Sequence, residues 1–162
     1  MQQLDQDDVS TTVAARPEDV YALAADVTRT PDFSPEVVAC RWLGGATGPV
    51  VGARFEAVNR SPNGRTWKNH PVVTVAEPGR EFAFTRTEPF AGTIAWRYCF
   101  EPDSTGTRVT LGYEVQRPVS PLGWFLIEKV YRGHDRRNAL HEGMRTTLER
   151  LRAAAEGTVT SD

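Results

Sequence analysis

A long amphipathic segment near the C-terminal end, residues 120–156, constrains the fold of this chain more than any other feature. Its apolar residues recur at intervals of three and four, which places them on one face of an α-helix. Gly157 follows at a position where helices commonly end. Because the apolar face needs a broad partner surface, we predict one long helix packed against a sheet, with a break near Gly133 as the alternative. The apolar face consists of Leu126, Ile127, Val130, Tyr131, Leu140, Met144, Leu148 and Leu151.

The segments before this helix supply the partner surface, because apolar and polar residues alternate along most of them. Alternation with period two, rich in β-branched and aromatic residues, is typical of half-buried strands. Tight turns such as Ser-Pro-Asn-Gly at residues 61–64 join consecutive strands and predict an antiparallel meander. Pro71 interrupts one strand and predicts a bulge or an edge position there. The predicted strands cover residues 9–15, 37–43, 52–60, 66–76, 81–87, 93–100 and 108–116.

Two short helices are predicted between the first and second strands. Pro17 suits the first turn of a helix, and the two acidic residues after it favour the positive end of the helix dipole. A second short helix or turn covers residues 28–35. This order of elements predicts an α+β fold, with a curved antiparallel sheet of about seven strands wrapped around the C-terminal helix. We expect a single domain over residues 1–162, with flexible tails at 1–7 and 157–162.

The composition is that of an ordinary soluble globular protein. The chain has 162 residues and a net charge of -2, so its charge gives no reason to expect a nucleic-acid partner. No segment approaches the roughly 20 apolar residues of a membrane span, and residues 1–8 lack the apolar core of a signal peptide. The two widely separated cysteines then predict reduced thiols in the cytoplasm. The sequence leaves open whether the protein is a monomer or a homodimer.

Motifs for metal, phosphate and nucleophilic chemistry are missing from the sequence. No grouping of His, Cys, Asp and Glu has the spacing of metal ligands, so we expect no metal and no cofactor. His70 is predicted on the outer face of its strand, whereas His134 and His141 flank the apolar face of the last helix. Each histidine is more typical of a packing residue than of a catalytic base. Cys40 and Cys99 have no activating neighbour in the sequence and are predicted to be inert thiols.

Four short segments resemble one superfamily of proteins. They are residues 16–21, 75–82, 96–98 and 106–110, which form a helix start, hairpin turns and strand cores. Together with the order of elements, they resemble the START-like, or SRPBCC, superfamily with its helix-grip fold, and most closely its polyketide cyclase/dehydrase-like group. The resemblance extends over about residues 9–155. It implies a deep cavity between sheet and helix that holds an apolar small molecule, in a superfamily of aromatase/cyclases, sterol and lipid carriers and hormone receptors.

The strands carry more inward-facing aromatic residues than one helix could cover. Aromatic side chains line many small-molecule pockets, but they also fill solid cores, so the residues alone leave both alternatives open. The resemblance favours a cavity. We expect the ligand-binding wall to include Phe55, Asn59, Trp67, Asn69, Phe84, Trp96 and Met144.

Arg86, Tyr98 and Tyr113 are the predicted catalytic residues. A guanidinium beside a cavity binds a carboxylate, phosphate or enolate oxygen and stabilises charge that develops on a carbonyl. A tyrosine hydroxyl donates a hydrogen bond or a proton in an aldol-type closure or a dehydration. In the aromatase/cyclase relatives, an Arg and a Tyr or Ser in the cavity have such roles, and the match here is by strand face only. The alternative for Arg86 is that it lies near a strand end and reaches solvent.

Three functions remain open from the sequence. The first is a cofactor-independent enzyme of the cyclase/dehydrase kind that acts on a polyketide-like or other apolar carbonyl substrate. The second is a non-catalytic carrier or sensor for a lipid, sterol or aromatic metabolite, which would use the same cavity. The third is an interaction module with a filled core and no ligand.

Overall fold

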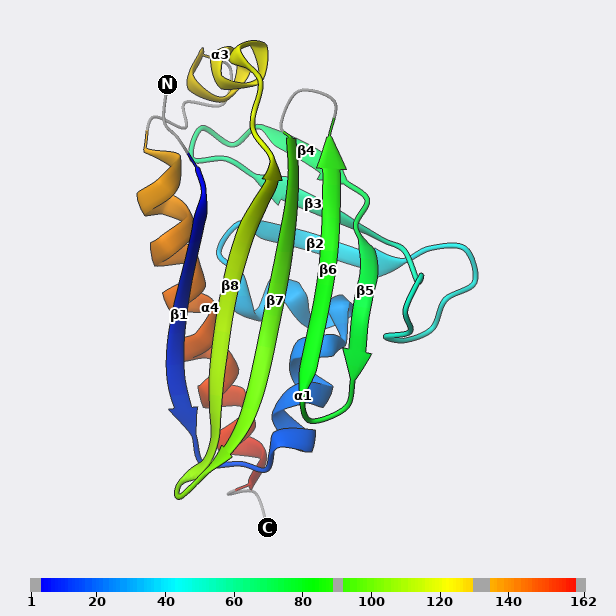
Figure 1. The fold of residues 1–162 in the computed structure, drawn as a ribbon, viewed down its shortest axis with the longest axis vertical. Helices are drawn as coiled ribbons and strands as arrows, with labels where there is room; N and C mark the ends of the chain where they lie inside the picture. Colours follow the sequence, from blue (N-terminus) through cyan, green and yellow to red (C-terminus); the bar gives the residue numbers. More distant parts are fainter. Residues whose placement is uncertain (1–3, 89–91, 130–134, 160–162) are drawn as a thin grey trace.

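The structure is a computed structural model that describes residues 4–88, 92–129 and 135–159 (Figure 1). One strand and a group of short helices come first, seven strands follow, and two helices end the chain. The elements are β1 (Gln6–Val13), α1 (Pro17–Ala25), a 3-10 turn (Val27–Arg29), α2 (Thr30–Phe33), β2 (Val37–Trp42), β3 (Phe55–Arg60), β4 (Thr66–Asn69), β5 (Val72–Glu77), β6 (Glu81–Glu88), β7 (Gly92–Asp103), β8 (Gly106–Arg117), α3 (Pro121–Lys129) and α4 (Arg136–Val159).

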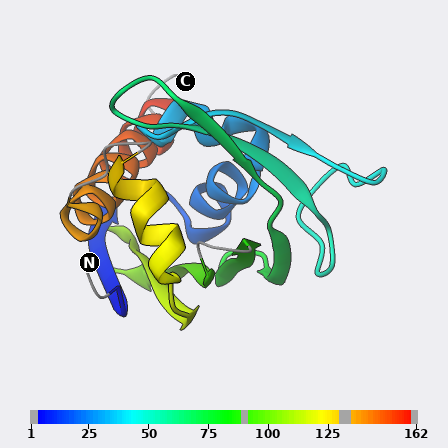
Figure 2. The ribbon, with the colours of Figure 1, turned by 90° about the horizontal axis from the view of Figure 1, so that it is seen from above.

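The strands form two antiparallel sheets. The larger sheet has the order β1-β8-β7-β6-β5, and the smaller has the order β2-β3-β4. The helix α1 packs against β6, β7 and β8 of the larger sheet, and α4 lies along β1 at one side of the molecule (Figure 1 and Figure 2). The predicted α+β fold, with antiparallel strands curved around a long C-terminal helix, is therefore confirmed.

Pro71 divides one predicted strand into two. We predicted a single strand over residues 66–76, but β4 pairs with β3 in the smaller sheet, whereas β5 pairs with β6 in the larger one. Pro71 has no N–H to donate to a ladder, so pairing cannot continue through it. Its carbonyl instead accepts a hydrogen bond from the Phe55 amide at 3.2 Å, which joins the two sheets. The structure therefore has eight strands among its described residues, one more than predicted.

Both ends of the fold extend further than the sequence indicated. β1 begins at Gln6 and pairs along its whole length with β8, so Gln6 and Asp7 belong to the sheet and not to the predicted tail. At the other end, α4 continues through Gly157 to Val159. The break near Gly133 lies outside the described residues, as do Val130, Tyr131 and His134, but α3 and α4 are separate helices on either side of it.

The apolar face of α4 forms one wall of the core. Leu140, Met144, Leu148 and Leu151 are all buried, as their spacing predicted. The helix packs against β1, α1 and α2. Burial of side chains of this size stabilises the fold by about 1.5–3 kcal/mol each. This packing fixes α4 beside the space between the sheets.

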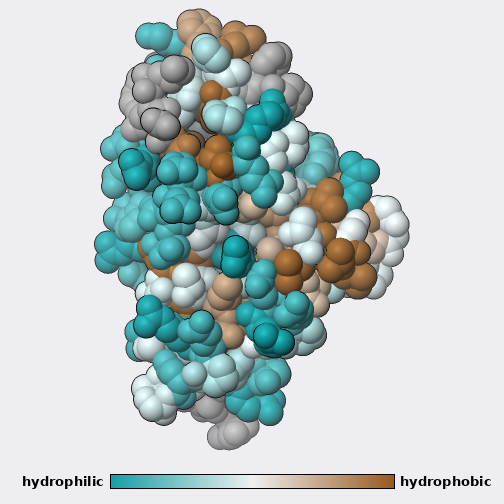
Figure 3. Space-filling view, in the orientation of Figure 1, coloured by the Kyte–Doolittle hydropathy of each residue, from teal (hydrophilic) through white to brown (hydrophobic). Residues whose placement is uncertain are grey.

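Polar side chains cover most of the face shown in Figure 3. Apolar residues gather at its right edge, where the connection between β2 and β3 projects and where Val50 and Val51 are exposed. Leu122 and Phe125 on α3 are exposed as well. Among the described residues, no helix is both long and apolar enough to cross a membrane.

Candidate functional site

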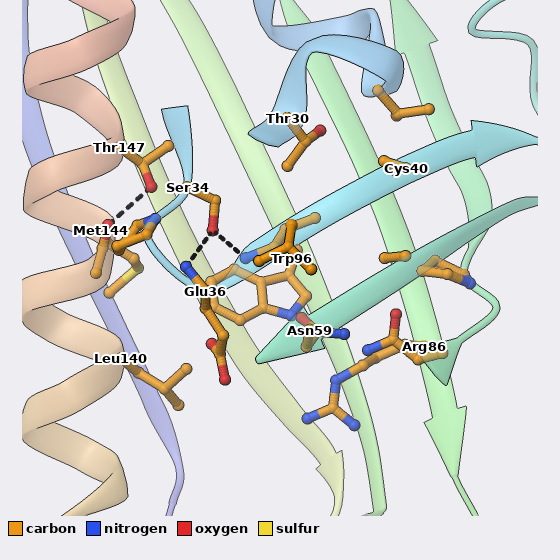
Figure 4. A pocket seen from close by; sticks show the side chains of 18 of the residues that line it. Thr30, Ser34, Glu36, Cys40, Asn59, Arg86, Trp96, Leu140, Met144 and Thr147 are labelled. Carbon is orange, nitrogen blue, oxygen red and sulfur yellow. Dashed lines mark hydrogen bonds between the residues drawn. The ribbon is translucent and has the colours of Figure 1, made fainter. Parts of the chain in front are cut away.

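A cavity of about 520 Å³ lies between the two sheets, α1 and α4 (Figure 4). This volume falls in the range of roughly 300–1,000 Å³ that small-molecule pockets occupy. Apolar side chains make up most of its wall, with a few polar groups between them. The aromatic residues of the strands therefore enclose an open space, and the alternative of a completely filled core is wrong.

Every predicted ligand-binding residue lines this cavity. The alternation of the strands explains the result, because Phe55 and Asn59 are two pleats apart on β3, and Phe84 and Trp96 face the same side of their strand pair. Their contact with a ligand remains a prediction. The seven residues are Phe55, Asn59, Trp67, Asn69, Phe84, Trp96 and Met144.

Two of the three predicted catalytic residues, Arg86 and Tyr98, also line the cavity. Tyr113 does not. It lies opposite Trp96 in the β7–β8 pair, with ring centroids 5.2 Å apart, and only 4% of it is exposed. Its neighbour Trp96 does line the cavity. The hydroxyl of Tyr113 is buried without a hydrogen-bond partner among the described residues, so we do not retain it as a group that touches a ligand.

Arg86 extends from β6 into the space between the larger sheet and α4 (Figure 4). Arg86 is half-buried and lines the cavity, whereas the alternative placed it at a strand end in solvent. Burial is the largest cause that lowers the pKa of Arg86, and the positive charge of Arg136 lowers it further. The nearby carboxylates of Glu88 and Glu36 act in the opposite direction and raise this pKa. An arginine remains protonated under such conditions, so the cavity holds a permanent positive charge.

No hydrogen bond or ion pair of Arg86 is found within the described ranges of the chain. A partly buried charge without a protein partner loses hydration that nothing in the protein replaces, and such a charge is typical of a site that binds an anion or a polar group of a ligand. Asn59 from β3 is only 6% exposed, and its amide nitrogen is buried without an acceptor among the described residues.

Tyr98 lines the same cavity from β7. Its ring stacks on Phe100 at 6.2 Å between centroids, with 11° between the planes. Burial raises the pKa of Tyr98 well above its ordinary value of 10.0. The hydroxyl is therefore protonated at neutral pH and can serve as a hydrogen-bond donor.

Glu36 and Arg136 form an ion pair at the rim of the cavity, with 2.7 Å between Oε1 and Nη1. Their side chains are 27% and 21% exposed. The Arg136 guanidinium also lies over the Trp67 ring, 5.9 Å from its centroid. Sequence reasoning missed this pair, because the two residues are a hundred positions apart and neither lies on a strand face. The Ser34 hydroxyl holds the Glu36 segment in place by accepting hydrogen bonds from the Glu36 and Val37 amides (Figure 4).

The cysteines have the character of inert thiols, as predicted. Cys40 lines the cavity, and burial is the main cause that raises its pKa to about 12. Cys99 is also free, and burial raises its pKa too. The thiolate is the nucleophilic form of cysteine, so neither residue is activated near neutral pH.

The described histidines lie away from the cavity wall. His70 directly follows β4, is exposed as predicted for an outward-facing residue, and contacts Glu56 at 3.2 Å. His141 lies 2.7 Å from Asp7 of β1. The part of the chain that the structure describes contains no cluster of three or more His, Cys, Asp or Glu residues able to hold a metal ion.

Comparison with known proteins gave a family and a set of similar structures. The family described as "Polyketide cyclase / dehydrase and lipid transport" matches residues 8–156. The Polyketide_cyc-like protein Cgl2372 from Corynebacterium glutamicum is 30% identical, with a TM-score of 0.58 over 98% of this chain and 95% of that chain. No protein with a curated description matches the sequence.

Two further structures are similar in fold. Protein CV1439 from Chromobacterium violaceum has a TM-score of 0.69 at 17% identity, over 94% of this chain and 99% of that one. The di-domain ARO/CYC StfQ, from the steffimycin biosynthetic pathway, has a TM-score of 0.76 at 16% identity. The alignment covers 95% of this chain but 51% of StfQ, so this chain spans about half of that two-domain protein.

Proposed function

The chain belongs to the polyketide cyclase/dehydrase and lipid-transport family, and from that membership we propose that it binds an apolar small molecule in its cavity and acts as a cofactor-independent cyclase or dehydrase. The observation that carries this proposal is a mostly apolar cavity of about 520 Å³ that both Arg86 and Tyr98 line. The substrate would be a polyketide-like molecule or another apolar molecule with several carbonyl groups.

The cavity would act first as a template. Its aromatic walls, among them Trp96 and Phe84, would hold a flexible chain in a folded shape, so that two distant carbons of the substrate lie close together. Orientation of this kind can account for a large part of a rate enhancement, because the entropy of bringing the groups together is lost on binding and not in the reaction.

Arg86 and Tyr98 would then polarise one carbonyl group. A methylene between two carbonyls loses a proton to water, and the resulting carbanion forms a bond to the polarised carbonyl carbon. The electron pair of the C=O bond moves to its oxygen, where Arg86 stabilises the charge and Tyr98 supplies a proton. Tyr98 regains a proton from water. Loss of water from the new alcohol would complete a dehydration.

A carrier of a lipid or aromatic metabolite is the second candidate. The described cavity wall includes no histidine, and its one carboxylate, Glu36, is held in an ion pair with Arg136. A cavity without a free general base favours binding over proton abstraction. The family description also includes lipid transport.

Substitution of two tyrosines separates these candidates. Binding is followed with N-phenyl-1-naphthylamine, a neutral fluorescent probe of apolar cavities, and turnover with a linear poly-β-carbonyl thioester. For an enzyme, Tyr98→Phe should lower turnover at least about tenfold, or 1.4 kcal/mol of barrier, with probe binding unchanged. The matched control is Tyr113→Phe, which removes a buried hydroxyl outside the cavity and should leave turnover unchanged. A wild-type protein that binds the probe but turns over no substrate is a carrier, and one that does not bind the probe contradicts the proposal.

A further inference from the structure

The cavity is positively charged in a protein whose total charge is negative. Four charged residues line it, and three of them, Arg60, Arg86 and Arg136, carry a positive charge against one carboxylate, that of Glu36. The residues that line the cavity therefore carry a net charge of +2, whereas the whole chain carries -2. A charge of one sign in an enclosed, weakly polarisable space selects ligands of the opposite sign.

Arg86 is the residue whose charge is available to a ligand. Arg136 is already bound to Glu36 at 2.7 Å, and Arg60 is exposed to solvent. Arg86, in contrast, has no ion pair or hydrogen bond with any described residue, and Figure 4 shows its guanidinium within the cavity. A planar guanidinium presents parallel N–H donors that match the two oxygens of a carboxylate.

Glu88 lies two residues further along β6, so its carboxylate could pair with Arg86 in place of a ligand. Glu88 does not line the cavity. Its negative charge acts on Arg86 electrostatically and raises the pKa of Arg86. No ion pair within 4.0 Å joins the two side chains, and the Oε1 atom of Glu88 is buried without a hydrogen-bond partner among the described residues. Glu88 therefore reduces the cost of the buried charge without occupying its donors.

We propose that the ligand of this cavity is an apolar molecule with one carboxylate, which binds to Arg86 at the end of the cavity near the start of α4. This inference rests on the binding of an apolar molecule in the proposed function and names the class of that molecule; a carboxylate at Arg86 takes the place of the carbonyl oxygen that a cyclase would polarise there, and so favours the carrier. Asn59 lies on the opposite wall, on β3. The apolar body of the ligand extends from there towards Ala24, Val27 and Phe82.

A pair of ligands of nearly equal shape tests the charge directly. Anthracene-9-carboxylate and anthracene-9-carboxamide have the same apolar body and differ in charge, and N-phenyl-1-naphthylamine reports on the apolar cavity alone. Fluorescence titration of the wild-type chain should show the carboxylate at least about tenfold tighter than the carboxamide, since charged hydrogen bonds are stronger than neutral ones. Equal affinities would overturn this inference while binding of the neutral probe left the proposed function standing.

Two arginine variants assign the preference to Arg86. Arg86→Met keeps the length of the side chain and should abolish the preference for the carboxylate, with probe binding within about twofold of the wild type. Arg97→Met removes the same charge from the outer face of the adjacent strand, where Arg97 is exposed, and should leave the preference intact. A preference that survives Arg86→Met would overturn the assignment. Failure of the wild-type chain to bind any of the three molecules would overturn the proposed function and this inference together.

Discussion

Arg136, the first residue of α4, donates from Nη1 to Oε1 of Glu36 at 2.7 Å and so ties the last helix to the connection between α2 and β2. Trp67 of β4 lies beneath the same guanidinium. Three segments that are far apart in the sequence therefore meet at the rim of the cavity. The rim can widen at this point only if the Glu36 carboxylate and the Arg136 guanidinium separate.

Loss of this ion pair should speed the release of a bound molecule. Glu36→Gln removes one charge with little change of shape, and we expect the neutral naphthylamine probe to dissociate several-fold faster, because a half-buried pair contributes on the order of 1 kcal/mol. Stopped-flow displacement measures the rate. Glu142→Gln is the control, since Glu142 forms an exposed pair with Arg145 on the same helix. Equal dissociation rates in the two variants would show that the pair does not restrict the rim.

Removal of the charge at residue 86 should stabilise the empty protein. Arg86→Met replaces a half-buried cation that has no partner among the described residues by an apolar side chain of similar length, and exchanges of buried charged groups for apolar ones are neutral or stabilising by about 1–4 kcal/mol. We expect a rise in melting temperature of a few degrees, roughly 2–4 °C for each kcal/mol in a chain of this size. Arg97→Met, on the exposed face, should change the melting temperature much less. A lower melting temperature for Arg86→Met would mean that the guanidinium has a stabilising partner.

The thiol of Cys40 should make stability fall at alkaline pH. Burial raises its pKa from 9.0 to about 12, so between these values the folded state keeps a proton that the unfolded state has lost. The folded state therefore binds more protons, and the free energy of unfolding falls as pH rises through this range. Relative to Cys40→Ala, the wild type should lose roughly 1 kcal/mol between pH 8 and pH 10.

Urea denaturation at each pH measures this difference. Cys99→Ala serves as the matched comparison and should show a smaller effect, since the pKa of Cys99 is raised less. Parallel pH profiles for the wild type and Cys40→Ala would refute the prediction.

Gly106 should tolerate no side chain. Its φ is 142°, and a Cβ would lie 2.5 Å from the carbonyl oxygen of Val13 and 2.8 Å from the amide of Ala15. The atoms it would meet belong to the backbone between β1 and α1, which cannot move aside easily. We expect Gly106→Ala to lower the free energy of unfolding by about 2 kcal/mol or more, measured by urea titration. Gly48→Ala, at an open position without contacts, should have little effect, and equal losses would contradict the steric argument.

Much of the cavity wall could be predicted, because side chains alternate across a strand and the alternation is visible in the sequence. This rule placed Arg86 and Phe84 on the inner face of β6, and Trp96 and Tyr98 on the inner face of β7. The same rule also predicted that Tyr113 lines the cavity, which it does not. Tyr113 is buried beside Trp96 on the larger sheet, and which of two adjacent rings reaches the open space depends on side-chain packing.

The rest depends on contacts between distant segments. Period and spacing give no information on the pairing of Glu36 with Arg136, which arises only when α4 is placed beside the α2–β2 connection. The sequence did indicate that Pro71 disturbs a strand. A proline lacks the backbone N–H donor in a bulge, at a sheet edge and at a change of sheet alike, so its presence does not distinguish the three. Only the pairing of β4 and β5 with different partners decides between them.

The passage of the chain through Pro71 has a mechanical consequence. β4 and β5 are separated by two residues, so the two sheets are continuous in the chain along one edge. Hydrogen bonds from the Phe55 amide to the Pro71 carbonyl and from the Val73 amide to the Ala53 carbonyl reinforce the same edge. On the side of α4, the smaller sheet is tied through the Glu36–Arg136 ion pair, so we expect the cavity to widen on that side first.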